Sequence, residues 1–286
     1  MFFMDKTLLS GMNLRNFCSW LVPLALVALG GCASLELAPS PRQPSNREAI
    51  LILPGLDWKF AKARSIMKGS DSDDIKSFAT TADSAGFDVF LADYKRRKSV
   101  DAGVEALHQF VEQHNIASYD RVHVFAYILG GYTFNRYLTH YPMENLASAV
   151  YDRSPLQELA PGLATEGWFS VLTWIAMGPV VADLAATPYT PIPRSNDYRI
   201  GLIIENRATR FIRKRRKRAL AVRPLTFEPD SLGQPFHAAI HVRFNHVEMY
   251  SNFDVIGPEL IHFFAHGDFS PEALRQPLGI DPFTKN

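Results

Sequence analysis

The segment best suited to chemistry lies near the middle of the chain, at residues 123–134. It reads as a buried strand, then a sharp turn containing Gly130 and Gly131, then a helix. A strand-turn-helix unit of this kind can lift one side chain to the edge of a sheet, where a hydroxyl could attack a carbonyl group. The residue at that point is Ile128, whose hydrocarbon side chain has no lone pair. Ile128 therefore cannot form an acyl intermediate.

The elements around this turn alternate between strands and helices from residue 47 onward. Acidic residues at positions 71–74 and Asp101 are expected to cap the first two helices, and Gly86 to end the first of them. The predicted strands are residues 49–53, 88–92, 121–125, 147–151, 198–204 and 236–242, and helical spacing follows at residues 75–82, 104–111, 134–138 and 256–264. This alternation predicts an α/β fold with a mostly parallel central sheet and helices on both faces.

The order of these elements resembles the α/β-hydrolase family between about residues 47 and 266. In that family the turn has the frame Gly-x-Ser-x-Gly-Gly, which falls here on residues 126–131 with Ile128 in the place of the serine. The resemblance implies the α/β-hydrolase fold over residues 47–286, with a cap or lid inserted at residues 155–196. It also implies lipase or esterase chemistry for members that keep their nucleophile.

The same resemblance implies positions for a carboxylate and an imidazole base, in that order after the nucleophile. His246 lies between an apolar strand and a helix, where family members carry the base. Most members carry the carboxylate after the strand at residues 201–204, where this chain has Glu205. Some lipases carry it one strand earlier, where Asp152 lies. We favour Asp152 as the remnant acid, although an ion pair with Arg153 explains that residue equally well, and Glu205 ranks behind it.

The oxyanion hole of this family uses backbone N–H groups, so it can persist when side chains change. The donors would be Leu56, after the first strong strand, and Leu129, after the nucleophile position. Both could survive as the floor of a pocket.

Three nearby hydroxyls are weighed as replacements for the missing serine. Tyr127 should point to the opposite face of its strand or away from the pocket, because neighbours on a strand alternate. Thr133 is too deep in the first turn of its helix to meet the oxyanion donors. Ser154 could reach the rim of the cleft but lacks a strained turn to expose it. A working substitute nucleophile is therefore not expected.

The first 31 residues predict an export signal rather than part of the fold. Lys6 and Arg15 precede an apolar run at residues 21–28 that is too short for a membrane span. Residues 29–32 read Leu-Gly-Gly-Cys and resemble the bacterial lipobox, which implies that Cys32 becomes the lipidated first residue of the mature protein. The other cysteine, Cys18, leaves with the signal, so no disulfide within the chain is expected.

Residues 32–46 contain three prolines and are expected to form a tether between the lipid and the domain. The residues after Cys32 are alanine and serine, and the absence of aspartate there resembles lipoproteins sorted to the outer membrane. The expected location is the cell envelope, anchored by lipid and facing the periplasm.

Two further segments bear on partners. Residues 168–182 contain no charge and are expected to pack as a cap or lid, or to meet lipid or a partner protein. A basic run covers residues 207–218, which include no acid. Such a run is usually a solvated helix face, and on a tethered protein it could contact anionic headgroups. Its basic residues are Arg207, Arg210, Arg213, Lys214, Arg215, Arg216, Lys217 and Arg218.

Two functional hypotheses follow. The first is a lipoprotein with an α/β-hydrolase domain that has lost its nucleophile and acts as a binding or scaffold module, with an acyl or lipid ligand as the expected class. The second is an active hydrolase of acyl esters that uses a displaced nucleophile or activated water. No cofactor or nucleic-acid partner is expected, and no metal site is predicted, because the sequence has neither HExxH-like spacing nor a cysteine cluster.

Overall fold

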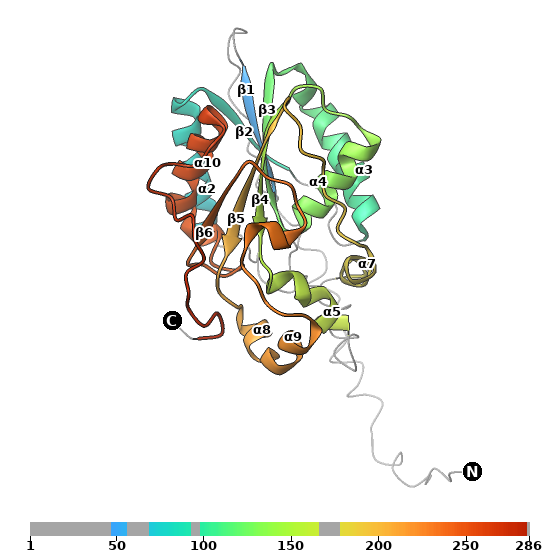
Figure 1. Ribbon diagram of the computed structural model, residues 1–286. Coiled ribbons are helices and arrows are strands. Elements are labelled where there is room, and N and C mark those ends of the chain that lie inside the picture. Colours follow the sequence, from blue (N-terminus) through green and yellow to red (C-terminus); the bar gives the residue numbers. More distant parts are fainter. Residues whose placement is uncertain (1–46, 56–68, 93–97, 166–177, 285–286) are drawn as a thin grey trace, which may run out of the picture. The chain divides into compact units, whose positions relative to one another are not determined.

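The computed structural model describes residues 47–55, 69–92, 98–165 and 178–284 (Figure 1). Its centre is a six-stranded sheet in which every neighbouring pair is parallel, in the order β2-β1-β3-β4-β5-β6. The strands are β1 (Glu48–Leu53), β2 (Phe87–Leu91), β3 (Arg121–Tyr127), β4 (Leu146–Arg153), β5 (Arg199–Glu205) and β6 (Ala238–Val242). All six strands predicted from the sequence are confirmed.

Helices cover both faces of this sheet. Helices α3 and α4 lie on one face, and α2 and α10 on the other (Figure 1). The α-helices are α2 (Gly69–Ser84), α3 (Val100–Gln113), α4 (Leu129–His140), α5 (Ala160–Thr165), α7 (Val180–Ala186), α8 (Arg210–Arg213), α9 (Arg216–Val222) and α10 (Phe253–His266). Short 3₁₀ turns span Ile116–Ser118, Gln157–Leu159, Pro229–Leu232 and Tyr250–Asn252.

The continuous apolar runs in the strands are explained by burial on both faces. In β1, Leu51 packs into the cluster beneath α3 and α4, while its neighbours Ile50 and Ile52 pack into the cluster beneath α2 and α10. Fully burying one such side chain stabilises the fold by about 1.5–3 kcal/mol. A parallel sheet covered by helices on both faces is therefore stable, because apolar side chains point to both faces of its strands.

The predicted helix starts need correction. Ser99, rather than Asp101, caps α3, since its hydroxyl accepts a hydrogen bond from the N–H of Ala102 at 3.0 Å. Asp101 lies in the first turn and pairs with Arg136 instead. Helix α2 begins at Gly69, so the acidic residues at 71–74 lie inside it rather than before it.

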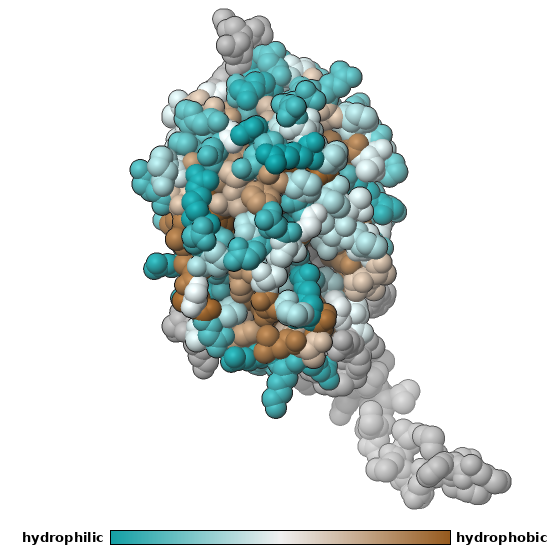
Figure 2. All heavy atoms as spheres, in the orientation of Figure 1, coloured by the Kyte–Doolittle hydropathy of each residue, from teal (hydrophilic) through white to brown (hydrophobic). Residues whose placement is uncertain are grey.

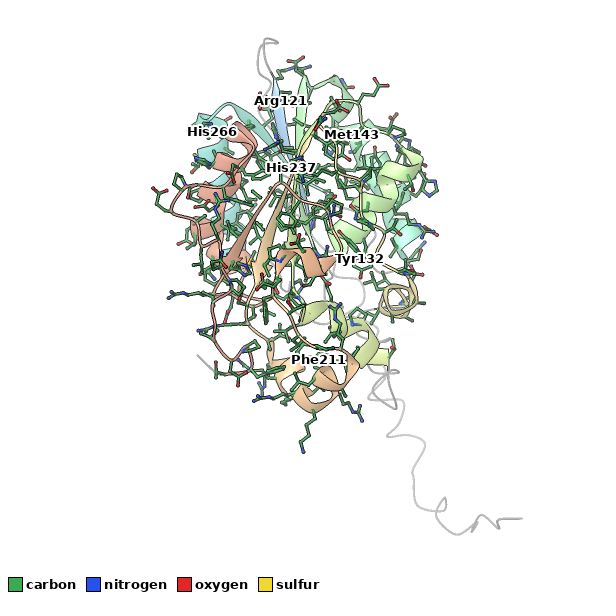
Figure 3. The ribbon with its side chains drawn as sticks, viewed as in Figure 1. Arg121, Tyr132, Met143, Phe211, His237 and His266 are labelled. Carbon is green, nitrogen blue, oxygen red and sulfur yellow. The ribbon has the colours of Figure 1, made fainter. Side chains whose placement is uncertain are left out.

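The carboxyl ends of the strands carry the smaller helices α5, α7, α8 and α9. In Figure 3, the label Arg121 marks the amino end of β3, and the label Phe211 marks α8, which lies beyond the carboxyl ends of the strands. Helix α7 is held over the start of α4, because Val180 and Val181 pack in one cluster with Leu129. Asp183 also accepts the N–H of Val100 at 2.7 Å. This part of the predicted insertion at 155–196 thus lies beside the turn at Ile128.

Residues 166–177, which include the greater part of the uncharged segment at 168–182, lie outside the described residues. Within the described ranges, no helix has the length and apolar character needed to cross a bilayer.

Candidate functional site

The turn between β3 and α4 has the geometry of an elbow. Strand β3 ends at Tyr127 and α4 begins at Leu129, which leaves Ile128 alone between them with φ 26° and ψ −81°. Among the described residues other than glycine, only Asn115 and Ile128 have positive φ. A β-branched residue in this region is strained by about 1–3 kcal/mol and persists only where the surrounding structure imposes it.

The two glycines after Ile128 allow α4 to cross the sheet closely. A Cβ atom on Gly130 would lie 2.4 Å from the carbonyl oxygen of Leu53 in β1, which is a severe clash. A Cβ atom on Gly131 would lie 3.2 Å from Cδ1 of Tyr151 in β4. The predicted strand-turn-helix unit is thus confirmed, and isoleucine occupies its tip.

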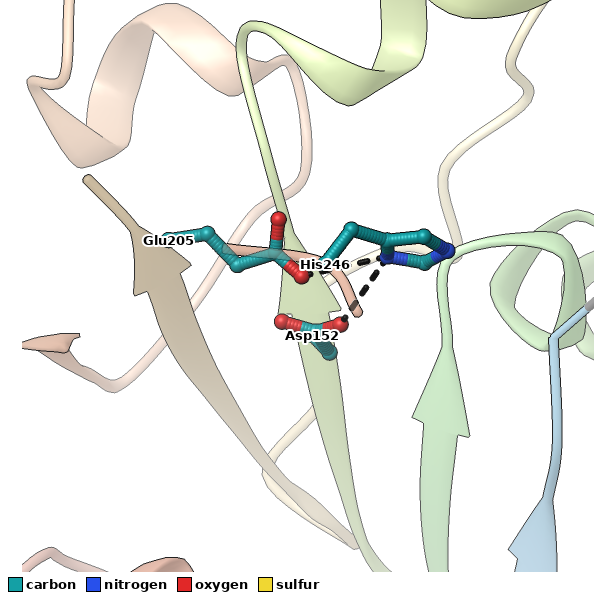
Figure 4. Close-up of side chains that lie close together, drawn as sticks. All are labelled: Asp152, Glu205 and His246. Atoms are coloured by element: carbon teal, nitrogen blue, oxygen red, sulfur yellow. Dashed lines mark hydrogen bonds and ion pairs between the residues drawn. The ribbon is translucent and has the colours of Figure 1, made fainter. Parts of the chain in front are cut away.

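His246 lies in the loop after β6, and one nitrogen of its ring faces two acids near the carboxyl ends of neighbouring strands (Figure 4). Its Nδ1 is 3.1 Å from Oε1 of Glu205 and 4.0 Å from Oδ2 of Asp152. Both acids point to the same face because Asp152 pairs in register with Ile203, two residues before Glu205, and side chains alternate along a strand. The imidazole and the two candidate carboxylates therefore meet in space.

The order of preference between the two acids is changed by this geometry. The sequence favours Asp152 over Glu205 as the acid, but Glu205 is the nearer partner of the imidazole. The proposed ion pair between Asp152 and Arg153 does not form. Arg153 points away from Asp152, as alternation requires, and its Nε donates to Glu158 at 2.6 Å.

Burial sets the protonation of this group. Asp152 and Glu205 are fully buried. Burial raises the pKa of Glu205 to about 8, against hydrogen bonds with Asp152 and Ser154 that lower it. Burial and the neighbouring Glu205 also raise the pKa of Asp152 well above its usual range. Burial lowers the pKa of His246 to about 4, against the opposing effect of Asp152. The lowered pKa favours a neutral imidazole at pH 7, and its Nδ1 shares one hydrogen bond with Oε1 of Glu205.

Tyr127 packs against the imidazole. The two rings are stacked, with centroids 4.5 Å apart and planes 16° from parallel, and the tyrosine hydroxyl donates to the carbonyl oxygen of His246. Of the two alternatives expected for Tyr127, the opposite face of its strand holds, but this does not remove the residue from the site. Alternation does turn its ring to the face opposite Ala126, but the loop carrying His246 covers that face.

Gly55 makes room for this stack. A Cβ atom at Gly55 would lie 2.7 Å from Cδ1 of Tyr127 and 3.8 Å from Nε2 of His246. The packing of Tyr127 on His246 and the space that Gly55 leaves for it are not predicted by the sequence. Their pairing leaves no signal in one sequence, because it depends on the path of a loop about 120 residues away.

The other hydroxyls remain unsuited to replace the serine. Thr133 is buried one turn into α4. Ser154 is also buried, and its Oγ accepts the N–H of Gln157 at 3.1 Å. Within the described ranges, no hydroxyl or thiol makes a hydrogen bond to Nε2 of His246.

One of the two expected oxyanion donors can be placed. Leu129 is the first residue of α4, where a backbone N–H has no acceptor inside the helix. Leu56 and Cys32 lie outside the described residues.

Asp152, Glu205 and His246 could also hold a metal ion. One ligand atom from each lies within 4.8 Å of the other two. Carboxylate and imidazole ligands suit zinc and other divalent transition metals. Sequence spacing did not indicate this set, because its members come from three separate segments brought together by the sheet.

The basic run forms α8, a turn and α9 at the carboxyl end of the sheet. Of its eight basic side chains, five are exposed and three are partly buried. Arg215 lies over the ring of Phe211 at 3.9 Å, and Arg216 pairs with Asp281 at 3.3 Å. The exposed members are Arg210, Lys214, Arg216, Lys217 and Arg218.

The strand order, the elbow after β3, the acids ending β4 and β5, and the histidine after β6 decide the architecture. The chain has an α/β-hydrolase fold. No family model matches its sequence, and no curated protein does so.

Solved structures similar to this α/β-hydrolase fold include three enzymes. Polyneuridine aldehyde esterase is 12% identical in sequence and has a TM-score of 0.46; the match covers 76% of this chain and 99% of the esterase chain. An esterase from Exiguobacterium antarcticum is 10% identical with a TM-score of 0.46, covering 80% and 94%. A bromoperoxidase from Bacillus anthracis is 14% identical with a TM-score of 0.44, covering 77% and 92%.

Proposed function

We propose that this protein is a lipid-anchored binding module of the cell envelope, built on an α/β-hydrolase fold that no longer performs covalent acyl transfer. The observation that carries the proposal is Ile128 at the tip of the elbow, with φ 26°, while His246 still contacts Glu205 at the carboxyl edge of the same sheet. A positioned base without a nucleophile cannot open an ester by the covalent route. Loss of the nucleophile from such a site costs about 10⁶ in turnover.

The ligand proposed for the remnant site is an acyl chain or lipid. Ile128 and His246 both retain partial exposure. Leu129 and the α7 valines Val180 and Val181 make an apolar cluster beside the elbow. Apolar walls with a few fixed polar groups are typical of small-molecule sites.

Membrane attachment is proposed to use the lipid on Cys32, with α8 and α9 resting on anionic headgroups. Leu220 and Val222, in α9, are 46% and 58% exposed beside the basic side chains. Figure 2 shows hydrophobic side chains among hydrophilic ones over α8 and α9. A basic residue near such a surface contributes about 1 kcal/mol at most, and shallow apolar insertion adds to it.

Ester turnover tests the binding-module proposal. Purified full-length protein is assayed with p-nitrophenyl butyrate and p-nitrophenyl palmitate beside His246→Ala. We expect equal background rates for the two proteins. A wild-type rate that His246→Ala abolishes would overturn the proposal.

A second candidate is hydrolysis by a water molecule that the His246–Glu205 pair activates. The hydrogen bond between Nδ1 and Glu205 favours it, since the bond orients the ring and, in the tautomer with the proton on Nδ1, leaves the lone pair of Nε2 available as a base. This candidate predicts ester turnover that His246→Ala abolishes, without labelling by a serine-reactive fluorophosphonate. The two assays together separate it from a displaced nucleophile.

A further inference from the structure

A cavity is formed by the segment after β6 and by Arg207, and neither Ile128 nor His246 lines it. It has a volume of about 370 Å³ and is lined by Arg207, Arg243, Phe244, Glu248 and Asn252. It opens at the carboxyl ends of β5 and β6, which is where parallel α/β sheets bind their ligands.

The sheet places the two arginines next to each other. Glu205 in β5 pairs in register with Val242 in β6. Arg243 follows its strand directly, and Arg207 follows β5 by two residues, so the guanidinium groups leave neighbouring strands at the same edge. Strand adjacency thus brings the two residues to one edge of the sheet, where Arg207 is partly buried and Arg243 is exposed.

Neither guanidinium has an acceptor among the residues that the structure describes. No ion pair or hydrogen bond joins Arg207 or Arg243 to another described group, and the Nε of Arg207 is buried without a partner. Other arginines behave differently: Arg153 pairs with Glu158, and Arg275 pairs with Asp268. The Nε of Arg207 is a buried cationic donor without an acceptor, which is costly, and an anion in the cavity would remove that cost.

The acidic residue in the lining is occupied elsewhere. Oε2 of Glu248 accepts the N–H of Asn245 at 3.0 Å. Nδ2 of Asn252 donates to the backbone oxygen of Glu248 at 2.7 Å, which holds the turn in place. With two cations and one anion, the lining carries a net positive charge.

We propose that this cavity binds a phosphate group, with Arg207 and Arg243 as its donors. Each guanidinium is a rigid fork that takes two oxygens, so two forks need more oxygens than one carboxylate provides. A phosphate group supplies them. Phe244, partly buried against the sheet, forms an apolar wall beside the anion. The phosphate could belong to a soluble compound or to a phospholipid headgroup, and the proposal does not rest on the proposed function.

The test titrates full-length protein with inorganic phosphate and with acetate, using calorimetry at fixed ionic strength. We expect saturable phosphate binding that Arg207→Gln and Arg243→Gln each weaken about tenfold or more. The control is Lys214→Gln, which removes the same charge from an exposed position of the basic run and should change affinity less than about twofold. Thermal melts check that each variant is folded.

Vesicle binding identifies the source of the phosphate. Vesicles of phosphatidylcholine, with and without phosphatidylglycerol, are compared using Cys32→Ser to remove the predicted lipid. If the protein binds vesicles only when both arginines are present, and inorganic phosphate competes with that binding, the ligand is a phospholipid headgroup. If the protein binds inorganic phosphate but not vesicles, the ligand is a soluble compound. Absence of saturable phosphate binding, equal weakening by Lys214→Gln, or equal affinity for acetate would overturn the proposal.

Discussion

Replacing Gly130 by alanine should destabilise the fold, because this glycine marks a close approach between α4 and β1. The added Cβ atom would lie 2.4 Å from the backbone oxygen of Leu53, and a central strand cannot move aside. Overpacking at the upper end of its usual range costs about 3 kcal/mol. The better helix propensity of alanine returns about 1 kcal/mol. We therefore expect the free energy of unfolding to fall by about 2 kcal/mol.

Gly162→Ala is the matched control for this substitution. Gly162 lies in α5, and a Cβ atom there meets nothing within 4 Å. The control should gain about 0.5–1 kcal/mol from helix propensity alone. Urea unfolding followed by circular dichroism measures both variants. A Gly130→Ala protein as stable as the wild type would show that α4 does not cross β1 at this distance, and the elbow described here would be wrong.

Three further predictions concern the site and the anchor. Because burial raises the pKa of Glu205 to about 8 from 4.5, the folded state keeps a proton that the unfolded state loses, so stability should fall as pH rises toward 8. His246, with its pKa lowered from 6.5 to about 4, has the opposite effect below pH 6.5. Urea unfolding should therefore show the fall most clearly between pH 6.5 and 8, and Glu205→Gln should flatten it. Tyr127→Phe keeps the stacked ring but loses its hydrogen bond, so urea unfolding should show a loss of about 1 kcal/mol. Cys32→Ser should abolish incorporation of radiolabelled palmitate in cells and release the protein from the membrane fraction; continued labelling would contradict the lipid anchor.

Much of the fold could be predicted because strand burial and helix periodicity are local signals. The runs at 49–53 and 198–204 are apolar at both parities, which is the pattern of a strand covered on two faces. Gly130 and Gly131 also carried information, since a glycine pair after a strand indicates close passage of the next helix. The start of α3 was placed wrongly because Ser99 and Asp101 are both good capping residues, and only the backbone path distinguishes them.

The site was less accessible to sequence reasoning because it depends on contacts between distant strands. Asp152 and Glu205 end adjacent strands at the same parity, so both reach His246, and the one that lies closer depends on side-chain length and register. The stack of Tyr127 on the imidazole likewise depends on where the loop after β6 passes. The pairing of Arg207 with Arg243 has the same origin, since only strand adjacency joins them.

The central claim is that no nucleophile acts at the elbow, and the mass of the intact protein after treatment with a fluorophosphonate tests it most directly. The account predicts an unchanged mass for the wild type. It also predicts one adduct, located on residue 128, for Ile128→Ser, because His246 still contacts its acid partner Glu205 at the edge of the sheet where the elbow lies. An adduct on the wild type that His246→Ala prevents would contradict the claim.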